Sequence, residues 1–471
     1  MDTKSILLDT DSYKVSMWKQ YPPGTEYVYS YITSRGGKFK KTKFFLAQKF
    51  ARDLAAIRVT MADVEIADKF WTAHGEPFNR EGWEYIVTKH GGRLPLEIRT
   101  LDEGLVIPTG IVLATVVNTD PKVPWLTTWV ETPFLRDVWY GTTVATQSWS
   151  IKELIKGYLE TSGDVAGLPF KLHDFGSRGV SSNESAVSGG MAHLTNFMGT
   201  DTAIAIIGAA QYYDADLYAT GFSIPAAEHS TITSWGRGYE ALAYENMVNQ
   251  FSKEGSIYAV VSDSYDIYNA VDNIWGVQLA DLIREKKGTL VIRPDSGDPV
   301  EVIPRLLTSL AKNFGYVKND KGYLVLNNVR LIWGDGINEM TIRSILRVVV
   351  DVMGYSADNI AFGMGGALLQ IVNRDDLKFA MKCSAIRRRK ITRNGEVDEW
   401  VDVFKDPVTD KGKASLKGRF AVVRSSNGDW ANVPIDDKTL VADNELKIRF
   451  RDGYLMNMQT FTQVRANEEK S

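Results

Sequence analysis

Residues 289–298 read TLVIRPDSGD, an apolar run of mostly β-branched residues that ends in a cation, a proline and two carboxylates. The run predicts a buried β-strand, and the Pro-Asp-Ser-Gly sequence predicts a turn directly after it. In parallel α/β folds ligands bind at the carboxyl ends of the strands, so Arg293 and Asp295 become candidate site residues. A strand followed by an ordinary turn explains this single stretch about equally well.

Six further segments between residues 170 and 366 repeat this arrangement of a short apolar strand and a polar or glycine-rich end. The ends are HDFGSRG (173–179), GTDT (199–202), EHST (228–231), SDSYD (262–266), GDG (334–336) and FGMGG (362–366). Stretches with helical spacing separate them. Seven or eight such βα units predict an α/β fold with a (β/α) barrel-like catalytic domain, for which we expect residues 166–382. Helix N-caps account for some of the polar ends.

The flanking segments have a different pattern. Residues 1–165 mix strands with helices, and residues 383–471 return to strands, with a hairpin turn at 393–396. We therefore expect an additional α+β domain, formed by residues 1–165 and joined by the C-terminal strands at 383–471. Within it, residues 34–43 are rich in Gly, Lys and Arg and predict a mobile basic loop. The tryptophan-rich stretch 122–160 predicts helical core or a subunit interface.

Composition narrows the function classes. The chain has 471 residues and a net charge of −3, which gives no general attraction to nucleic acid or to an anionic membrane. The single cysteine, Cys383, excludes an intrachain disulfide, and the first residues lack the apolar core of a signal peptide. The longest apolar runs are too short to cross a bilayer. We expect a cytoplasmic protein that binds neither nucleic acid nor membrane.

The polar strand ends suit a phosphorylated sugar. Backbone N–H groups at Gly365 and Gly366 would form an anion site at the start of a helix, and the acids Asp295 and Asp335 suit either ribose hydroxyls or a hydrated Mg²⁺. Walker, GxSxG and HExxH motifs are absent from the sequence, as is a Cys/His metal cluster. From the residues alone, the prediction ends at a barrel that acts on a small molecule carrying phosphate.

Eleven segments in order carry a more specific signal. They are DSYKVSMWKQYPPGTEYVYSY, EGWEYI, KLHDFGSRGVSS, GTDT, IPAAEHSTITSWG, VVSDSYDIYNA, IRPDSGDP, GDGIN, AFGMGGALLQ, MKCS and VFKDPV. Together they resemble the nicotinamide phosphoribosyltransferase family, type II of the nicotinate/nicotinamide phosphoribosyltransferases, from about residue 6 to residue 420. The resemblance implies transfer of phosphoribosyl from phosphoribosyl pyrophosphate to nicotinamide in NAD salvage, on a homodimer whose active sites contain residues of both subunits.

The resemblance also assigns the residues that would bind the pyridine. Phe175 forms one face of a ring sandwich, and Tyr13 of the partner subunit forms the other. Asp201 accepts the carboxamide N–H, Arg293 donates to its carbonyl oxygen, and Ser223 is a further substrate-binding residue. Because the carboxylate of Asp201 would repel nicotinic acid in a desolvated pocket, the amide is favoured over the acid.

The same resemblance places the phosphoribosyl pyrophosphate. Asp295 would hold the ribose diol beside Gly334 and Asp335, and these two acids would hold Mg²⁺ weakly, through phosphate and water. The 5′-phosphate would lie on Arg178, Gly365 and Gly366. The residues expected around pyrophosphate, some from the other subunit, are Arg35, Arg374, Lys382, Lys405 and Lys413.

His229 has two interpretations. A histidine beside Glu228 and Ser230 is more often an ordinary loop residue, which spacing alone favours by roughly two to one. In the resemblance it is the phosphohistidine through which optional, activating ATP hydrolysis is coupled to synthesis, oriented by Asp263 or Glu228. The expected catalytic set is therefore His229, Asp263, Asp295 and Asp335.

Four positions depart from the family pattern, and three alternatives remain open. Ser177 replaces a tyrosine of vertebrate relatives, Met364 and Ala367 replace small residues of the phosphate loop, and Ala380 replaces a hydroxyl. The alternatives are a nicotinate phosphoribosyltransferase, a barrel isomerase or aldolase for sugar phosphates, and a non-catalytic protein that binds nicotinamide or phosphate.

Overall fold

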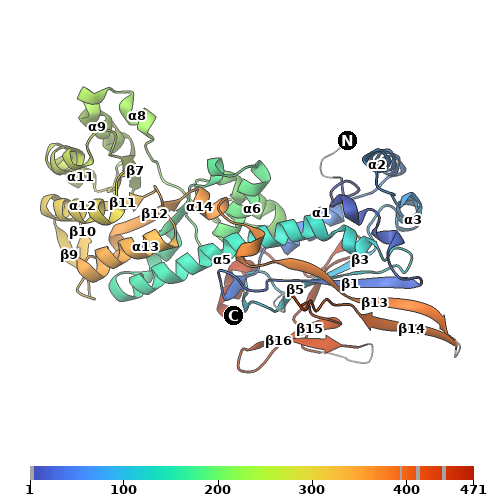
Figure 1. The fold of residues 1–471 in the computed structure, drawn as a ribbon. Coiled ribbons are helices and arrows are strands. Elements are labelled where there is room, and N and C mark those ends of the chain that lie inside the picture. The colour runs from blue at the N-terminus through green and yellow to red at the C-terminus, as the bar shows by residue number, and fades with distance from the viewer. Residues whose placement is uncertain (1–4, 393–394, 410–413, 437–441) are drawn as a thin grey trace. The chain divides into compact units, whose positions relative to one another are not determined.

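The computed structural model describes residues 5–392, 395–409, 414–436 and 442–471 (Figure 1). The chain forms two compact units. The first unit contains residues 1–146, 209–215 and 373–471, and the second contains residues 147–208 and 216–372. The sequence-based boundaries, at 165/166 and 382/383, follow a different division of the chain and stay predictions.

A parallel sheet lies at the centre of the second unit. Its order is β6-β12-β11-β8-β7, and every neighbouring pair is parallel. The strands are β6 (Leu172–Asp174), β7 (Ile257–Val261), β8 (Thr289–Arg293), β11 (Val329–Trp333) and β12 (Ile360–Met364). Five of the seven apolar runs predicted from the sequence are these strands, and their apolar side chains are largely buried. A small antiparallel pair, β9 (Tyr316–Lys318) and β10 (Leu324–Leu326), lies outside this sheet.

Two more chain segments continue the parallel sheet from β6 to β7. Single parallel bridges join Asp174 to Thr200, Gly199 to Phe222 and Ala226 to Ala259. Backbone hydrogen bonds support them, for example from the N–H of Asp201 to the carbonyl oxygen of Asp174 at 2.9 Å. All seven predicted strand segments therefore belong to one curled parallel sheet, which confirms the expected barrel-like domain.

Helices follow the strands of this unit. They are α6 (Asn183–Leu194), α7 (Ala203–Tyr213), α8 (His229–Thr233), α9 (Glu240–Phe251), α10 (Ile267–Asn269), α11 (Ala280–Lys286), α12 (Pro299–Phe314), α13 (Glu339–Leu346) and α14 (Gly366–Leu369). Side chains of Ser182, Asp298 and Asn338 cap α6, α12 and α13, as their positions predict. Two expected continuous helices are interrupted, because residues 270–278 and 347–352 form π-helix.

The first unit is built on an antiparallel sheet from both ends of the chain. Its order is β14-β13-β1-β5-β3-β17-β18. The strands are β1 (Thr25–Thr33), β3 (Leu96–Thr100), β5 (Val112–Asn118), β13 (Ala380–Thr392), β14 (Gly395–Asp402), β17 (Lys447–Arg451) and β18 (Tyr454–Leu455). Because β1 pairs with β13 and β3 pairs with β17, the N-terminal and C-terminal segments share one sheet. This confirms the expected additional α+β domain.

Helices and short strands complete the first unit. They are α1 (Ala47–Ala56), α2 (Met61–His74), α3 (Arg80–His90), α4 (Leu126–Trp129), α15 (Phe461–Ala466), β2 (Lys41–Lys43), β4 (Val106–Pro108), β15 (Arg419–Arg424) and β16 (Trp430–Ile435). Helix α5 (Glu131–Ser162) contains the boundary between the units. Trp71, Trp83, Trp125 and Trp129 pack edge to face in the core, so packing explains the density of tryptophan there.

The prediction of a mobile basic loop at residues 34–43 is wrong for part of that stretch. Residues 41–43 are β2, which pairs with β4. The side chain of Lys43 is fully buried and pairs with Glu468 at 2.6 Å. Sequence composition marked this lysine as solvated because its acidic partner lies 425 residues further along the chain.

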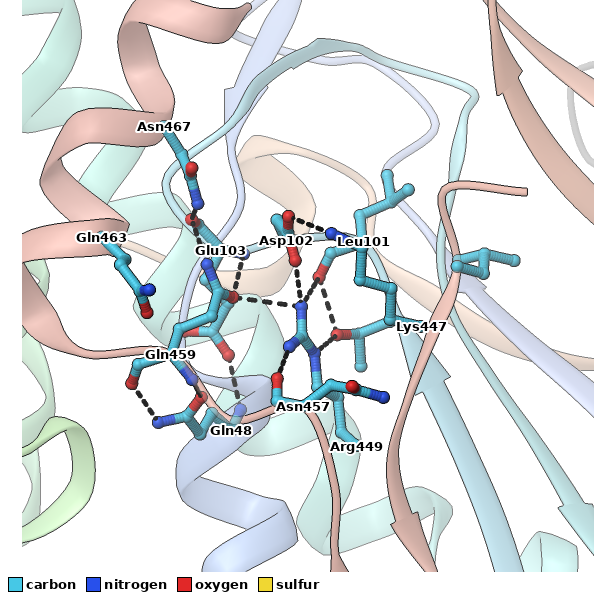
Figure 2. Close-up of polar contacts among 12 residues, drawn as sticks. Gln48, Leu101, Asp102, Glu103, Lys447, Arg449, Asn457, Gln459, Gln463 and Asn467 are labelled. Carbon is cyan, nitrogen blue, oxygen red and sulfur yellow. Dashed lines mark hydrogen bonds and ion pairs between the residues drawn. The ribbon is translucent and has the colours of Figure 1, made fainter. Parts of the chain in front are cut away.

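A buried polar network joins the end of the chain to this unit (Figure 2). Glu103 is 1% exposed and accepts the backbone N–H groups of Leu46 and Gln48 at the start of α1. Arg449 pairs with Asp102, and the side-chain amide of Asn467 donates to the carbonyl oxygen of Glu103 at 2.8 Å. The C-terminal helical turn therefore belongs to the folded core.

In the described part of the chain, no helix combines the length and hydropathy needed to cross a membrane.

Candidate active site

The curled parallel sheet brings the predicted side chains of the second unit to one edge. The residues that follow or end its strand segments are Phe175, Asp201, Ser223, Asp263, Arg293, Asp295, Gly334, Asp335, Gly365 and Gly366. In a parallel sheet the carboxyl ends of all strands lie on the same side, so these residues share that side. This is the convergence that a single site requires.

The ring of Phe175 lies over two glycines of neighbouring strand ends. A Cβ atom built at Gly363 would come within 1.9 Å of Cε2 of Phe175, and one at Gly334 would come within 3.5 Å of it. The same Cβ at Gly334 would lie 3.2 Å from Oδ1 of Asp295. Phe175 also packs on the apolar cluster that includes Ile332. Glycine at these positions therefore allows a flat aromatic ring to lie close to the backbone.

Asp201 offers an exposed carboxylate at the end of the strand segment next to β6. Its Oδ1 accepts a hydrogen bond from the hydroxyl of Ser223 at 2.6 Å. Its charge also acts on His173, whose pKa is lowered by burial and partly restored by Asp201. The second carboxylate oxygen can accept an N–H group from a ligand.

Arg293 and Asp295 form a charged pair at the end of β8. Nη2 of Arg293 and Oδ2 of Asp295 are 3.8 Å apart, and the two side chains are 19% and 27% exposed. Nε of Arg293 is buried and has no hydrogen-bond partner among the described residues. Nε has no surface that a ligand could reach, so a ligand at this place has to contact the exposed part of the guanidinium group.

Charged groups from several strand ends act on Asp295. Burial raises its pKa, the charge of Arg293 opposes the rise, and the carboxylates of Asp263 and Asp335 increase it. His229 also lowers the pKa of Asp295. These four residues therefore lie within electrostatic reach of Asp295, as expected for one catalytic set.

His229 is held by a carboxylate that is almost completely buried. Its Nε2 lies 3.0 Å from Oδ1 of Asp263, whose side chain is 6% exposed, while His229 itself is 45% exposed. Oδ2 of Asp263 accepts the hydroxyl of Ser296 at 2.6 Å. Glu228 is the N-cap residue of α8, and its backbone N–H donates to the hydroxyl of Thr231. Of the two acids that the sequence left open, Asp263 is the one that holds the imidazole.

The segments expected to bind the 5′-phosphate lie close together, but the helix that begins there is short. The helical turn at 177–179, which contains Arg178, lies against α14, since a Cβ built at Gly179 would be 3.3 Å from Gly366. Helix α14 ends at Leu369, earlier than the expected ALLQIVN helix. The backbone N–H groups of Gly365 and Gly366 stand at the start of this helix, as predicted. The helix dipole behind them is that of only four residues. Met364 is buried, 1% exposed.

The first unit gathers cations around Lys382. Burial lowers the pKa of Lys382, Glu131 opposes this effect, and the charges of Arg35, Lys405 and Lys14 lower it further. Cations that repel one another at a partly buried place predict an anion as ligand. Lys14 was missed from the sequence, although it follows Tyr13 in the DSYKV segment; its buried ammonium pairs with Glu131 at 2.6 Å.

Of three other predicted residues, two are exposed and one lies outside the described residues. The ring of Tyr13 is 62% exposed. Arg374 is exposed and 3.7 Å from Asp375, and no contact joins it to the cations around Lys382 among the described residues. Lys413 lies outside the described residues.

The described residues contain no group of three or more His, Cys, Asp or Glu side chains that could hold a metal ion. Asp295 and Asp335 are two carboxylates at neighbouring strand ends. Such a pair fits a Mg²⁺ ion that takes its other ligands from phosphate and water, as Mg²⁺ commonly does.

Comparison with known proteins decides the family. Residues 170–455 match the family model of the nicotinate phosphoribosyltransferase (NAPRTase) family, which is more than half of the chain. The chain belongs to this family. Residues 5–98 of this NAPRTase-family chain also match the nicotinamide phosphoribosyltransferase N-terminal domain.

Curated relatives cover almost all of this family member. A nicotinamide phosphoribosyltransferase of Xanthomonas campestris pv. campestris (strain 8004) is 50% identical over 472 residues, covering 99% of this chain and 98% of that protein. One of Mycoplasma pneumoniae (strain ATCC 29342 / M129 / Subtype 1) is 32% identical, covering 88% and 95%. The resemblance drawn from the eleven sequence segments is confirmed.

Solved structures of two related proteins have the same fold as this NAPRTase-family chain. A nicotinate-nucleotide pyrophosphorylase from Pyrococcus furiosus has a TM-score of 0.63 at 15% identity and covers 100% of this chain and 96% of its own. Human nicotinic acid phosphoribosyltransferase has a TM-score of 0.54 at 16% identity, with 98% and 93% covered. At these identities the likeness concerns the fold.

Proposed function

We propose that this protein transfers the phosphoribosyl group of phosphoribosyl pyrophosphate to nicotinamide, giving nicotinamide mononucleotide and pyrophosphate in NAD salvage. The relative that is 50% identical over nearly the full length carries this proposal, because a nicotinamide phosphoribosyltransferase and this chain share both units. The family assignment leaves no support for a sugar-phosphate isomerase or aldolase.

The geometry agrees with a neutral pyridine amide as acceptor. Asp201 accepts the carboxamide N–H, and the guanidinium group of Arg293 donates to the carboxamide oxygen. Phe175 supplies one stacking face, and we place Tyr13 of the partner subunit on the other. A carboxylate substrate would meet the negative charge of Asp201, so the amide binds better than the acid.

The reaction needs positioning and charge more than covalent help. The pyridine nitrogen forms a bond to C1 of the ribose while the bond from C1 to the pyrophosphate oxygen breaks, and pyrophosphate leaves. Alignment of the two reactants can supply about 7–11 kcal/mol of the barrier reduction. Asp295 stabilises the positive charge that develops at C1, and Lys382, Arg35 and Lys405 stabilise the leaving anion. Asp295 and Asp335 would hold a Mg²⁺ ion weakly, and such an ion would supply further positive charge at the leaving group.

ATP is proposed as an optional activator that acts through His229. The carboxylate of Asp263 holds one ring nitrogen of His229. The other nitrogen would accept the terminal phosphoryl group of ATP with release of ADP, and water would then cleave the phosphohistidine to phosphate. A homodimer with shared sites and a cytoplasmic location complete the proposal. Both stay predictions.

The test is a product assay with the purified full-length chain. Nicotinamide, phosphoribosyl pyrophosphate and Mg²⁺ are mixed with and without ATP, and nicotinamide mononucleotide and pyrophosphate are measured. We expect both products in equal amounts without ATP and a faster reaction with ATP. Formation of nicotinate mononucleotide from nicotinate at a higher kcat/KM would instead identify a nicotinate phosphoribosyltransferase. Absence of product from either base would point to the non-catalytic binding protein.

A further inference from the structure

Asp174 lies between the two residues proposed to contact the base. It is the last residue of β6 and directly precedes Phe175. Its carbonyl oxygen accepts the backbone N–H of Asp201 at 2.9 Å, so its backbone fixes the start of the segment that carries the amide-binding carboxylate. The residue itself is 0% exposed.

The two oxygens of this carboxylate have different surroundings. Oδ1 accepts the backbone N–H of Gly176 at 2.7 Å, which closes the turn around Phe175. Oδ2 is buried and has no hydrogen bond of good geometry among the described residues, and the hydroxyl of Thr202 is the polar group near it that lowers the pKa of Asp174. A Cβ built at Gly190 of α6 would lie 3.4 Å from Oδ2 and 2.5 Å from Cβ of Ala205. The packing is therefore too close for another side chain to reach Oδ2 from α6.

A charge at this place costs folding free energy. Burial raises the pKa of Asp174 to about 6. Hydrogen bonds from the backbone N–H of Gly176 and the hydroxyl of Thr202 oppose the rise, and the negative charge of Asp201 adds to it. An asparagine would keep the acceptor for Gly176 and would remove the charge. The turn therefore needs the oxygen of Asp174 but not its ionisation, and a destabilising charge beside a site points to a role in the site.

We infer that Asp174 is a specificity-determining positioning residue, whose buried charge stands behind Asp201 and helps the pocket to accept a neutral pyridine amide and to reject a pyridine carboxylate. This inference rests on the proposed function. Asp174 acts through the electric field and through the Phe175 turn, and it does not touch the base. Two like charges in a partly desolvated place repel an anionic substrate more strongly than one.

Among the described residues, Asp201 is the titratable group whose charge acts on the pKa of Asp174, and two histidines lie on adjoining segments. Asp201 follows the neighbouring strand segment, and His173 precedes Asp174 in β6. On α6, His193 interacts with the carbonyl oxygen of Gly199 at 3.2 Å. An Asp174→Asn variant retains all three groups, so any pH dependence that disappears in it belongs to Asp174.

The experiment compares kcat/KM for nicotinate and nicotinamide at several pH values, with the full-length chain. We expect Asp174→Asn to raise the nicotinate-to-nicotinamide ratio by about tenfold at pH 8, as removal of one of two nearby like charges predicts. In the wild type this ratio should rise as the pH falls from 8 to 6, because Asp174 takes up a proton. In Asp174→Asn that rise should be absent.

The matched control is Asp164→Asn, an exposed acid whose side chain likewise accepts a backbone N–H, that of Ala166 at 2.9 Å. It should leave the ratio unchanged. An Asp174→Asn ratio equal to that of the wild type at every pH would overturn the inference. If this variant does not fold, the wild-type profile decides, since a ratio that is flat between pH 6 and pH 8 also overturns it. Preference of the wild type for nicotinate would refute the proposed function itself.

Discussion

His229 lies where a carboxylate can orient its imidazole, which favours the proposed catalytic role over that of an ordinary loop residue. It is half-exposed, and the almost buried Asp263 holds one of its nitrogens at 3.0 Å. We predict that His229→Ala retains ATP-independent synthesis and loses stimulation by ATP, because only the phosphoryl acceptor is removed. Initial rates with and without ATP measure this, and the ATP-independent rate of the same variant is the internal control. Stimulation of wild-type size in the variant would contradict the role of His229.

Asp174 also gives a stability prediction with a definite sign. Its pKa is about 6 in the folded chain, against 3.8 for the ordinary group, so the folded state holds the proton more tightly and loses stability as the pH rises through 6. Asp174→Asn removes this loss. We expect the variant to be more stable than the wild type, by about 3 kcal/mol at pH 8 and roughly half of that at pH 5.

Unfolding midpoints at the two pH values test this. The midpoint of Asp174→Asn should exceed that of the wild type, and by more at pH 8 than at pH 5. If Asp174→Asn is less stable than the wild type at pH 8, or if its midpoint exceeds that of the wild type by the same amount at both pH values, then Asp174 is not a buried carboxylate that ionises at a cost in stability.

Single residues also mark the limit of prediction from sequence. Asp263 and Glu228 were equal candidates to hold His229, because sequence spacing does not give a distance between strand ends. Lys14 and Asp174 are sequence neighbours of predicted site residues, but the sequence alone does not single them out. Burial and unpaired atoms are visible only in three dimensions.

At the scale of elements, the glycine of strand β12, Gly363, decides where the stacking ring lies. We predict that Gly363→Ala lowers kcat/KM for nicotinamide by about a hundredfold, because a methyl group 1.9 Å from Cε2 of Phe175 must displace the ring and misplace the base. Gly157→Ala in α5 is the control, since nothing lies within 4 Å of its added Cβ. It should retain activity and gain slightly in helix stability.

Steady-state kinetics and the near-UV spectrum of the two variants measure this effect. If Gly363→Ala is folded and as active as Gly157→Ala, the ring of Phe175 does not form the pyridine face.

Elements differed in how well the sequence predicted them. Runs such as TLVIR gave correct strands because a parallel strand buried on both faces is apolar along its length. The π-helical stretches at 270–278 and 347–352 were missed, since their apolar spacing resembles that of an α-helix over so few turns. The buried Lys43 was misread because its partner is distant in sequence.

At the scale of the whole molecule, the sheet of the first unit was expected in outline only. Both ends of the chain read as strands, but the pairing of β1 with β13 and its register could not be derived from one sequence. Pairing between strands some 350 residues apart depends on the complete fold.

Shared active sites predict complementation between inactive subunits. Tyr13→Ala and Asp201→Asn should each be nearly inactive as homodimers. If the two proteins are mixed, unfolded and refolded together, half of the dimers are mixed and each has one intact site, so about a quarter of wild-type activity should return. A refolded mixture no more active than either parent would show that Tyr13 does not complete the site of a partner subunit.

The central claim is that Asp201, beside Phe175 and Arg293, selects a neutral pyridine amide for phosphoribosyl transfer. The most direct measurement is kcat/KM for nicotinamide relative to nicotinate, in the wild type and in Asp201→Asn. We predict a strong preference for nicotinamide in the wild type, reduced by about a hundredfold in the variant, because the charged acceptor is lost. A preference for nicotinate in the wild type, or one that Asp201→Asn leaves unchanged, would contradict the claim.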